Sequence, residues 1–241
     1  MPPEGSSSAP AAWSTASSSA PPANSTAAVW AILRKECRSE WRTRYGLNAA
    51  VLFAVTSLTA VTFAAGRIPD RPDLLAALLW VTLLFASLAS MSHAFVREME
   101  SRTMLFLRLI AAPTEIAVGK LLFNLIFLCV VEVITVPMFL VLTGAPRPHW
   151  GPFLTILGLG TLSLAASSTL VGAVIAQTRS RGALFAGVSL PLLLPVLAAG
   201  VAGTRAQWEG GSIAADARLL AAYAVALLGA SLLLYDHLWE D

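Results

Sequence analysis

Charged residues are scarce in this chain of 241 amino acids. Asp, Glu, Lys and Arg together make up 12% of the sequence, whereas hydrophobic residues make up 56% and the mean hydropathy is +0.71. A soluble domain carries about 25% charged residues, so this chain has too few polar side chains to cover a water-exposed surface. The composition therefore argues against a soluble enzyme and predicts an integral membrane protein.

Cysteine is also rare, and only Cys37 and Cys129 occur. They form no CxxC pair and no zinc-ligand spacing. We expect Cys37 near the cytoplasm and Cys129 within the membrane, so we predict no disulfide and interpret each as a small apolar residue. The net charge of +2 and the lack of a large basic patch give no indication of nucleic-acid binding.

The sequence lacks the common motifs of catalysis and nucleotide binding. Gly119 and Lys120 are followed by Leu121 and lack the upstream glycine of a GxxxxGK[ST] phosphate-binding loop. No HExxH or GxSxG motif occurs, and the three histidines are scattered: His93, His149 and His237. We expect no catalytic residues and no metal site. Energy for transport would then come from an ion gradient or from a separate ATPase.

The two ends of the chain differ in composition from the rest. Ala, Ser and Pro dominate residues 1–29, in which Glu4 is the one charged residue and Trp13 the one large aromatic residue. Such a segment buries too little apolar area to offset its ordering entropy, so we predict a disordered tail. It has neither the basic start nor the continuous apolar core of a signal peptide. Residues 236–241 predict an acidic cytoplasmic tail.

Residues 30–45 predict a basic amphipathic helix. Four residues recur at every fourth position and would share one helix face: Leu33, Cys37, Trp41 and Tyr45. Five basic residues occupy the other faces: Arg34, Lys35, Arg38, Arg42 and Arg44. We interpret this segment as a helix in the headgroup plane of a membrane. The alternative is a cytoplasmic surface helix packed on a partner.

Six apolar stretches follow, each long enough to cross about 30 Å of hydrocarbon as a helix. They cover residues 47–65, 74–95, 119–142, 152–176, 183–203 and 218–235. Eleven of the 16 Lys and Arg residues fall on the side of the basic helix, which places both termini in the cytoplasm. The predicted fold is an all-α polytopic membrane protein in which residues 30–235 form one six-helix domain.

Residues 95–120 form the most informative predicted cytoplasmic segment. The segment opens with mixed charges, at Arg97, Glu98, Glu100 and Arg102, and then becomes apolar up to a break at Pro113. Its pattern RExExxTMxxLxL resembles the segment after the second span of ABC-2-type permeases. In that family the segment holds a coupling helix, so the resemblance implies that the four charged residues face an ATPase subunit. The alternative is a cytoplasmic extension of the second span with a solvated charged face.

Residues 179–197 carry a more specific pattern. The sequence RSRGALFAGVSLPLLLPVL resembles the fifth span of the haem exporter protein B (CcmB) family. The resemblance implies the permease subunit of the cytochrome c maturation ABC transporter in the bacterial inner membrane. It also implies three partners: an ABC ATPase subunit that binds ATP, a CcmC-type haem-handling membrane subunit and a periplasmic haem chaperone. Alternatives are an ABC-2 exporter of a lipid, polysaccharide or drug, and a scaffold that only assembles other subunits.

Polar residues and prolines within the spans are the remaining candidate sites. Glu132 lies midway along an apolar span, where a carboxylate costs at least about 2.5–3.5 kcal/mol unless it is protonated or paired. Asn124 would lie on a similar face. We interpret both as contacts to a partner or to the transport pathway; the alternative is a protonated Glu132 bonded to a Ser or Thr of residues 163–169. Pro191 and Pro195 predict a bend that either lines a cavity or only improves packing.

The sequence contains no clear haem site. A haem axial ligand is a His, Met, Cys or Tyr side chain, and His149 beside Trp150 is the histidine best placed for that role. We interpret His149 as a solvated turn residue and assign no haem to this chain; the family resemblance allows for haem elsewhere in the complex. The small residues of 158–173 predict a surface for close helix packing, either within the bundle or against a second permease subunit.

Overall fold

The computed structural model describes residues 25–66, 70–101, 112–176 and 181–237. All regular secondary structure in these ranges is helical, which confirms the predicted all-α class. The helices are α1 (Ser25–Thr43), α2 (Tyr45–Ala65), α3 (Pro72–Ser101), α5 (Pro113–Thr143), α6 (Trp150–Ala176), α7 (Arg181–Trp208) and α8 (Ala214–His237).

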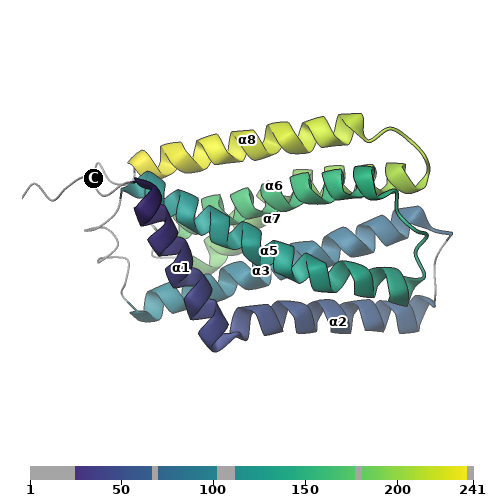
Figure 1. Cartoon of the computed structure of the whole chain (residues 1–241), viewed down its shortest axis with the longest axis horizontal. Coiled ribbons are helices and arrows are strands. Elements are labelled where there is room, and N and C mark those ends of the chain that lie inside the picture. Colours follow the sequence, from purple (N-terminus) through teal and green to yellow (C-terminus); the bar gives the residue numbers. More distant parts are fainter. Residues whose placement is uncertain (1–24, 67–69, 102–111, 177–180, 238–241) are drawn as a thin grey trace, which may run out of the picture.

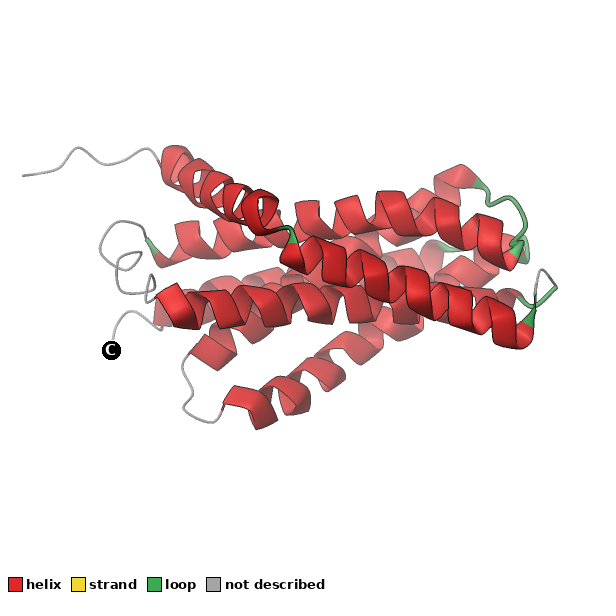
Figure 2. Ribbon diagram, turned by 90° about the horizontal axis from the view of Figure 1, so that it is seen from below, coloured by secondary structure: helices red, strands yellow, loops and turns green. Residues whose placement is uncertain are grey.

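The six helices from α2 to α8 run side by side along the long axis of the molecule, and α1 lies obliquely across one end (Figures 1 and 2). Ser25 and His237, the first and last described residues, are at that same end. The connections from α5 to α6 and from α7 to α8 are at the opposite end. Helix α6 packs against α3, α5, α7 and α8, and 67% of its apolar stretch is buried inside the chain.

Five of these helices are long and apolar enough to cross a membrane. The apolar stretches are Tyr45–Ala64, Thr114–Thr143, Trp150–Val171, Ser189–Trp208 and Ala214–Leu234. Each overlaps one of the predicted spans. The remaining predicted span, 74–95, is the second along the chain and falls within the 30-residue helix α3. The apolar stretch of α3 in the described part of the chain is the shorter Pro72–Leu88.

Trp80 of α3 holds the centre of the bundle together. Its indole is 1% exposed, and its Nε1–H donates a 2.8 Å hydrogen bond to Thr204 Oγ1 of α7. The ring lies against Gly160 of α6 and Gly200 of α7, and a Cβ atom at either glycine would overlap it. Three helices therefore meet at one buried tryptophan, and the two glycines provide the space for it.

Helix α1 differs in two respects from the predicted helix over 30–45. It begins at Ser25, inside the segment predicted as a tail, and ends at Thr43. Arg44 then adopts a left-handed conformation with φ 51°, so that Tyr45 starts the next helix rather than continuing this one. The expectation of one continuous helix through Tyr45 is therefore wrong, because four-residue spacing does not reveal where a chain turns.

The buried face of α1 also differs from the predicted one. Ile32, Leu33 and Glu36 are buried, whereas Trp41 is 74% exposed. The packing partner is mainly α5, where Gly119 lies directly against the Ile32 side chain. An α-helix has 3.6 residues per turn rather than four. Residues at every fourth position therefore move away from the contact face after about two turns. Only Leu33 and, in part, Cys37 of the predicted row lie on that face.

The corner between α1 and α2 consists of a single residue, Arg44. A carboxylate oxygen of Glu40, in the last turn of α1, accepts a 2.9 Å hydrogen bond from the backbone N–H of Leu47. This bond satisfies one of the amide donors that are left free at the start of α2. Gly46 leaves room for the carboxylate, since a Cβ there would come within 3.1 Å of Glu40 Oε1.

Candidate functional site at the contact of α5 and α6

Two polar pairs join α5 to α6 within the apolar bundle, and we call them the α5–α6 polar seam. Glu132 is hydrogen-bonded to Thr161, and Asn124 Nδ2 donates a 3.2 Å hydrogen bond to Thr169 Oγ1. The members of the seam are eight residues apart on each helix, with opposite chain directions. Both polar residues predicted on the third span therefore face α6.

Glu132 is enclosed by protein, with 8% of its surface exposed. Thr161 Oγ1 lies within hydrogen-bond reach of two acceptors, the Glu132 carboxyl and the Leu157 carbonyl oxygen at 2.8 Å. A threonine hydroxyl carries one hydrogen. A neutral carboxyl that donates to Thr161, while Thr161 donates to Leu157, satisfies all three groups. The hydroxyl partner is thus just outside the range 163–169 considered from the sequence.

The other hydroxyl groups of α6 reach two further helices. Ser168 shares a 2.9 Å hydrogen bond with Ser87 of α3. Ser163 Oγ lies within hydrogen-bond reach of two carbonyl oxygens, that of Leu159 in its own helix at 2.9 Å and that of Leu220 of α8 at 3.1 Å. Ala165 and Ala166 between them are fully buried. Most of the small residues predicted as a packing surface thus face neighbouring helices of the same chain as far as residue 171, although Gly158 is exposed.

Pro191 and Pro195 lie within α7, which continues through both of them. Pro191 is exposed on this chain and Pro195 is half-buried. Proline removes the hydrogen bond to the carbonyl oxygen four residues earlier. Nearby, the Tyr223 hydroxyl of α8 donates a 2.7 Å hydrogen bond to the Leu192 carbonyl oxygen. The proline-containing turn is therefore attached to α8 on one side and open on the other.

The proposed coupling residues fall at the end of α3. Arg97, Glu98 and Glu100 belong to its last turns, where the helical backbone continues to Ser101. Arg102 lies outside the described residues. This end of α3 is at the same end of the bundle as α1 (Figure 1). The first part of the segment therefore extends the second predicted span without a break.

At the opposite end, the loop that contains His149 is attached to the end of α7. The backbone N–H of His149 donates a 3.0 Å hydrogen bond to the buried Gln207 Oε1, and Trp208 Nε1–H donates to the Pro146 carbonyl oxygen at 3.2 Å. His149 itself is exposed. Within the described ranges, no group of three or more His, Cys, Asp or Glu residues is arranged to hold a metal ion.

Comparison with known proteins identifies the family. A family model described as "CcmB protein" matches residues 27–235, from the first turn of α1 to the last turns of α8. The chain belongs to the CcmB family. This CcmB chain is 30% identical to heme exporter protein B of Bradyrhizobium diazoefficiens over 188 residues, which cover 76% of this chain and 83% of that relative. Identity to heme exporter protein B of Rhodobacter capsulatus is 28% over 196 residues, 79% of this chain and 88% of that relative.

The resemblance inferred from residues 179–197 is thereby confirmed at the level of the family. Sequence reasoning missed two features of this CcmB chain: the Trp80 contact with Gly160 and Gly200, and the attachment of the His149 loop to Gln207. A lone tryptophan in an apolar span gave no signal by itself. Of the two glycines that face it, only Gly160 belongs to the stretch 158–173 whose small residues predict close packing.

Proposed function

We propose that this chain is the membrane permease subunit of an ABC transporter complex for cytochrome c biogenesis, which couples ATP hydrolysis in a partner subunit to haem delivery. The observation that carries the proposal is the match to the CcmB family over nearly the whole helical bundle. Two relatives named heme exporter protein B, each matched over more than four-fifths of its length, support haem as the cargo.

The proposed complex contains a separate ABC ATPase, a CcmC-type haem-handling membrane subunit and a periplasmic haem chaperone that is released in its haem-loaded form. The sequence has no phosphate-binding loop of its own, which supports a separate ATPase. We place the protein in the bacterial inner membrane with both termini in the cytoplasm. Support comes from the five basic residues from Arg34 to Arg44. They lie at the end of the bundle where α1 begins and α8 ends.

Within that complex, we assign ATPase docking to the end of α3 and the following residues, around Arg97, Glu98, Glu100 and Arg102. We assign a part in the transport pathway to the α5–α6 polar seam. Buried polar groups are costly in a membrane and frequently mark such pathways. Neither assignment requires haem to be bound by this chain.

The first experiment measures haem-stained c-type cytochromes in a strain that lacks this protein. The expected result is loss of all c-type cytochromes, with full restoration by the wild-type chain. Unchanged cytochromes in the deletion strain would contradict the proposal. An ABC-2 exporter of a lipid, polysaccharide or drug would then be the better account.

A second experiment tests docking through charge reversal. The variant Glu98→Lys/Glu100→Lys should lower the amount of ATPase subunit that co-purifies with the permease. A matched control reverses two charges at the opposite end of the bundle, Asp70→Lys/Glu209→Lys, both of which are exposed. Equal ATPase recovery for the two variants would refute the docking assignment.

The seam is tested with Glu132→Gln, because a glutamine amide can still donate to Thr161. The permease should therefore assemble at normal levels while c-type cytochrome content falls. Normal cytochrome content in this variant would show that Glu132 only holds α5 against α6.

A further inference from the structure

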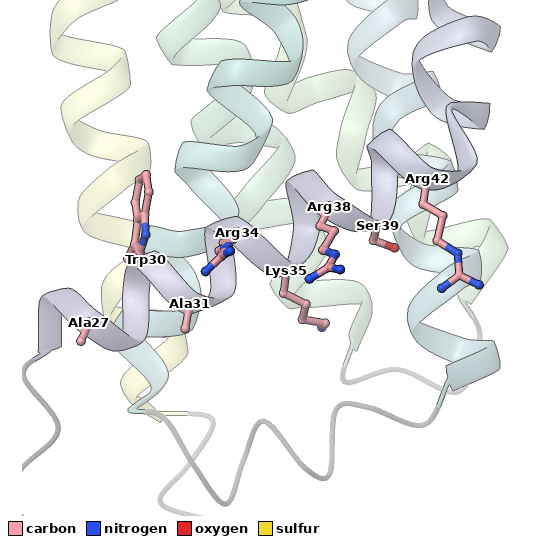
Figure 3. A pocket seen from close by; sticks show the side chains of 8 residues that line it. All are labelled: Ala27, Trp30, Ala31, Arg34, Lys35, Arg38, Ser39 and Arg42. Atoms are coloured by element: carbon pink, nitrogen blue, oxygen red, sulfur yellow. The ribbon is translucent and has the colours of Figure 1, made fainter.

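A shallow groove with a volume of about 640 Å³ lies on the face of α1 that points away from α5 (Figure 3). We call it the α1 basic groove. All of its lining residues come from this one helix: Ala27, Trp30, Ala31, Arg34, Lys35, Arg38, Ser39 and Arg42. The alanines and the serine are small, so the groove lies between the long side chains. No acidic residue lines it.

The charge in the groove is arranged in a stripe. Arg34, Arg38 and Arg42 follow one another at four-residue spacing, which places their side chains one above the other on a helix. Lys35 lies beside this stripe, and its Nζ forms a 3.2 Å ion pair with the buried Glu36. The groove therefore presents three guanidinium groups to an anion, whereas the ammonium group of Lys35 is already paired with Glu36.

The side chains in the groove point in two directions. In Figure 3 the Trp30 indole points up along the bundle, whereas the side chains of Lys35, Arg38 and Arg42 point the opposite way. Trp30 is 65% exposed. An aromatic ring on the apolar side and cations on the aqueous side are typical of a helix at the level of lipid headgroups. An acidic protein surface would meet the cations but would leave Trp30 without a partner.

We propose that the α1 basic groove binds the phosphate of an anionic phospholipid. Guanidinium groups form two parallel hydrogen bonds to phosphate oxygens, which a single ammonium group does not. The acyl chains of the lipid would extend along the apolar surface of the bundle, in the direction in which the Trp30 indole points. This inference does not depend on the proposed haem function, and it applies whatever cargo the permease transports.

The test uses the full-length protein purified in a zwitterionic detergent with added phosphatidylglycerol or phosphatidylcholine. Native mass spectrometry counts retained lipid, and a thermal melt gives the shift in Tm. Phosphatidylglycerol should be retained in preference to phosphatidylcholine and should raise Tm. In Arg38→Gln/Arg42→Gln its apparent affinity should fall at least about tenfold, since two cations near the headgroups are lost.

A matched control removes two exposed arginines at the opposite end, in Arg147→Gln/Arg218→Gln, and should retain phosphatidylglycerol like the wild type. Arg38→Lys/Arg42→Lys keeps the charge and should bind to an intermediate degree, which separates loss of binding from loss of folding. Equal retention in the Gln/Gln variant and the wild type would overturn the proposal. The proposal would also be overturned if inorganic phosphate alone raised Tm as much as phosphatidylglycerol does. A Gln/Gln variant that retains the lipid but loses the co-purified ATPase would overturn it as well.

Discussion

Helices α2 and α6 are nearly equal in hydropathy, yet they occupy opposite positions in the bundle. Two-thirds of the apolar stretch of α6 (67%) is buried within the chain, whereas only 17% of that of α2 is. Hydropathy therefore shows that both helices are compatible with a membrane. It does not show which of them is covered by protein and which by lipid.

The difference is in the side chains. Helix α2 presents bulky residues outward, with Phe63 87% and Leu52 64% exposed, and its hydroxyl groups bond within their own helix, as Thr62 does to the Leu58 carbonyl oxygen at 2.7 Å. Helix α6 presents glycine and alanine, and its hydroxyl groups also reach α3, α5 and α8. Association of helices in lipid depends on close packing and interhelical hydrogen bonds rather than on hydrophobicity.

The largest effect is expected at Gly160 of α6. In Gly160→Ala, the new methyl group would overlap the Trp80 ring and displace it from its bond to Thr204. Overpacking of this kind costs about 1–3 kcal/mol in the free energy of unfolding. Gly158→Ala, two residues away, meets nothing within 4 Å and should be neutral or slightly stabilising. Reversible unfolding in SDS-containing micelles measures both variants, and equal stabilities would show that α6 is not packed as described.

A smaller effect is expected at the α5–α6 polar seam. Thr161→Val removes the partner of Glu132 and should cost about 1 kcal/mol in the free energy of unfolding, measured in the same way. Thr135→Val on α5 is the control, because the buried Thr135 Oγ1 has no hydrogen-bond partner among the described residues. Its stability should be unchanged or higher. Equal losses in both variants would mean that the seam bond contributes nothing.

The smallest effect is expected on α2. Phe63→Ala should change the stability of the isolated chain by less than about 0.5 kcal/mol, because Phe63 is 87% exposed and makes little contact with the rest of the chain. Unfolding of the purified protein in micelles provides the measurement. A loss well above that value would place a protein surface over this face of α2.

The sequence was sufficient to predict the helices and most of their positions. Long apolar runs separated by Pro, Gly and charged residues predicted six spans, and five are long apolar helices within the described residues, while the remaining one lies in α3. The start of α1 at Ser25 and its end before Arg44 were not predicted. The left-handed turn at Arg44 occurs at a residue type that rarely adopts it, so nothing in the sequence marks the corner.

The candidate site was only partly accessible from the sequence. An isolated Glu132 in an apolar run is conspicuous, and helical spacing placed Asn124 on a similar face. The partners, Thr161 and Thr169, depend on how α5 and α6 are aligned along each other. That alignment is a property of tertiary packing, which one helix alone does not specify. The role of Trp80 was hidden for the same reason, since its two glycines are on other helices.

The one-residue corner at Arg44 has a mechanical consequence. With its 19 residues α1 is a stiff arm roughly 28 Å long. Because Glu40 is hydrogen-bonded across the corner to Leu47, this bond opposes a change in the angle between α1 and α2. A change in the tilt of α2 would therefore act directly on α1 through this corner. At the same time Ile32 packs closely on Gly119 of α5, so the position of the basic groove depends on both α2 and α5.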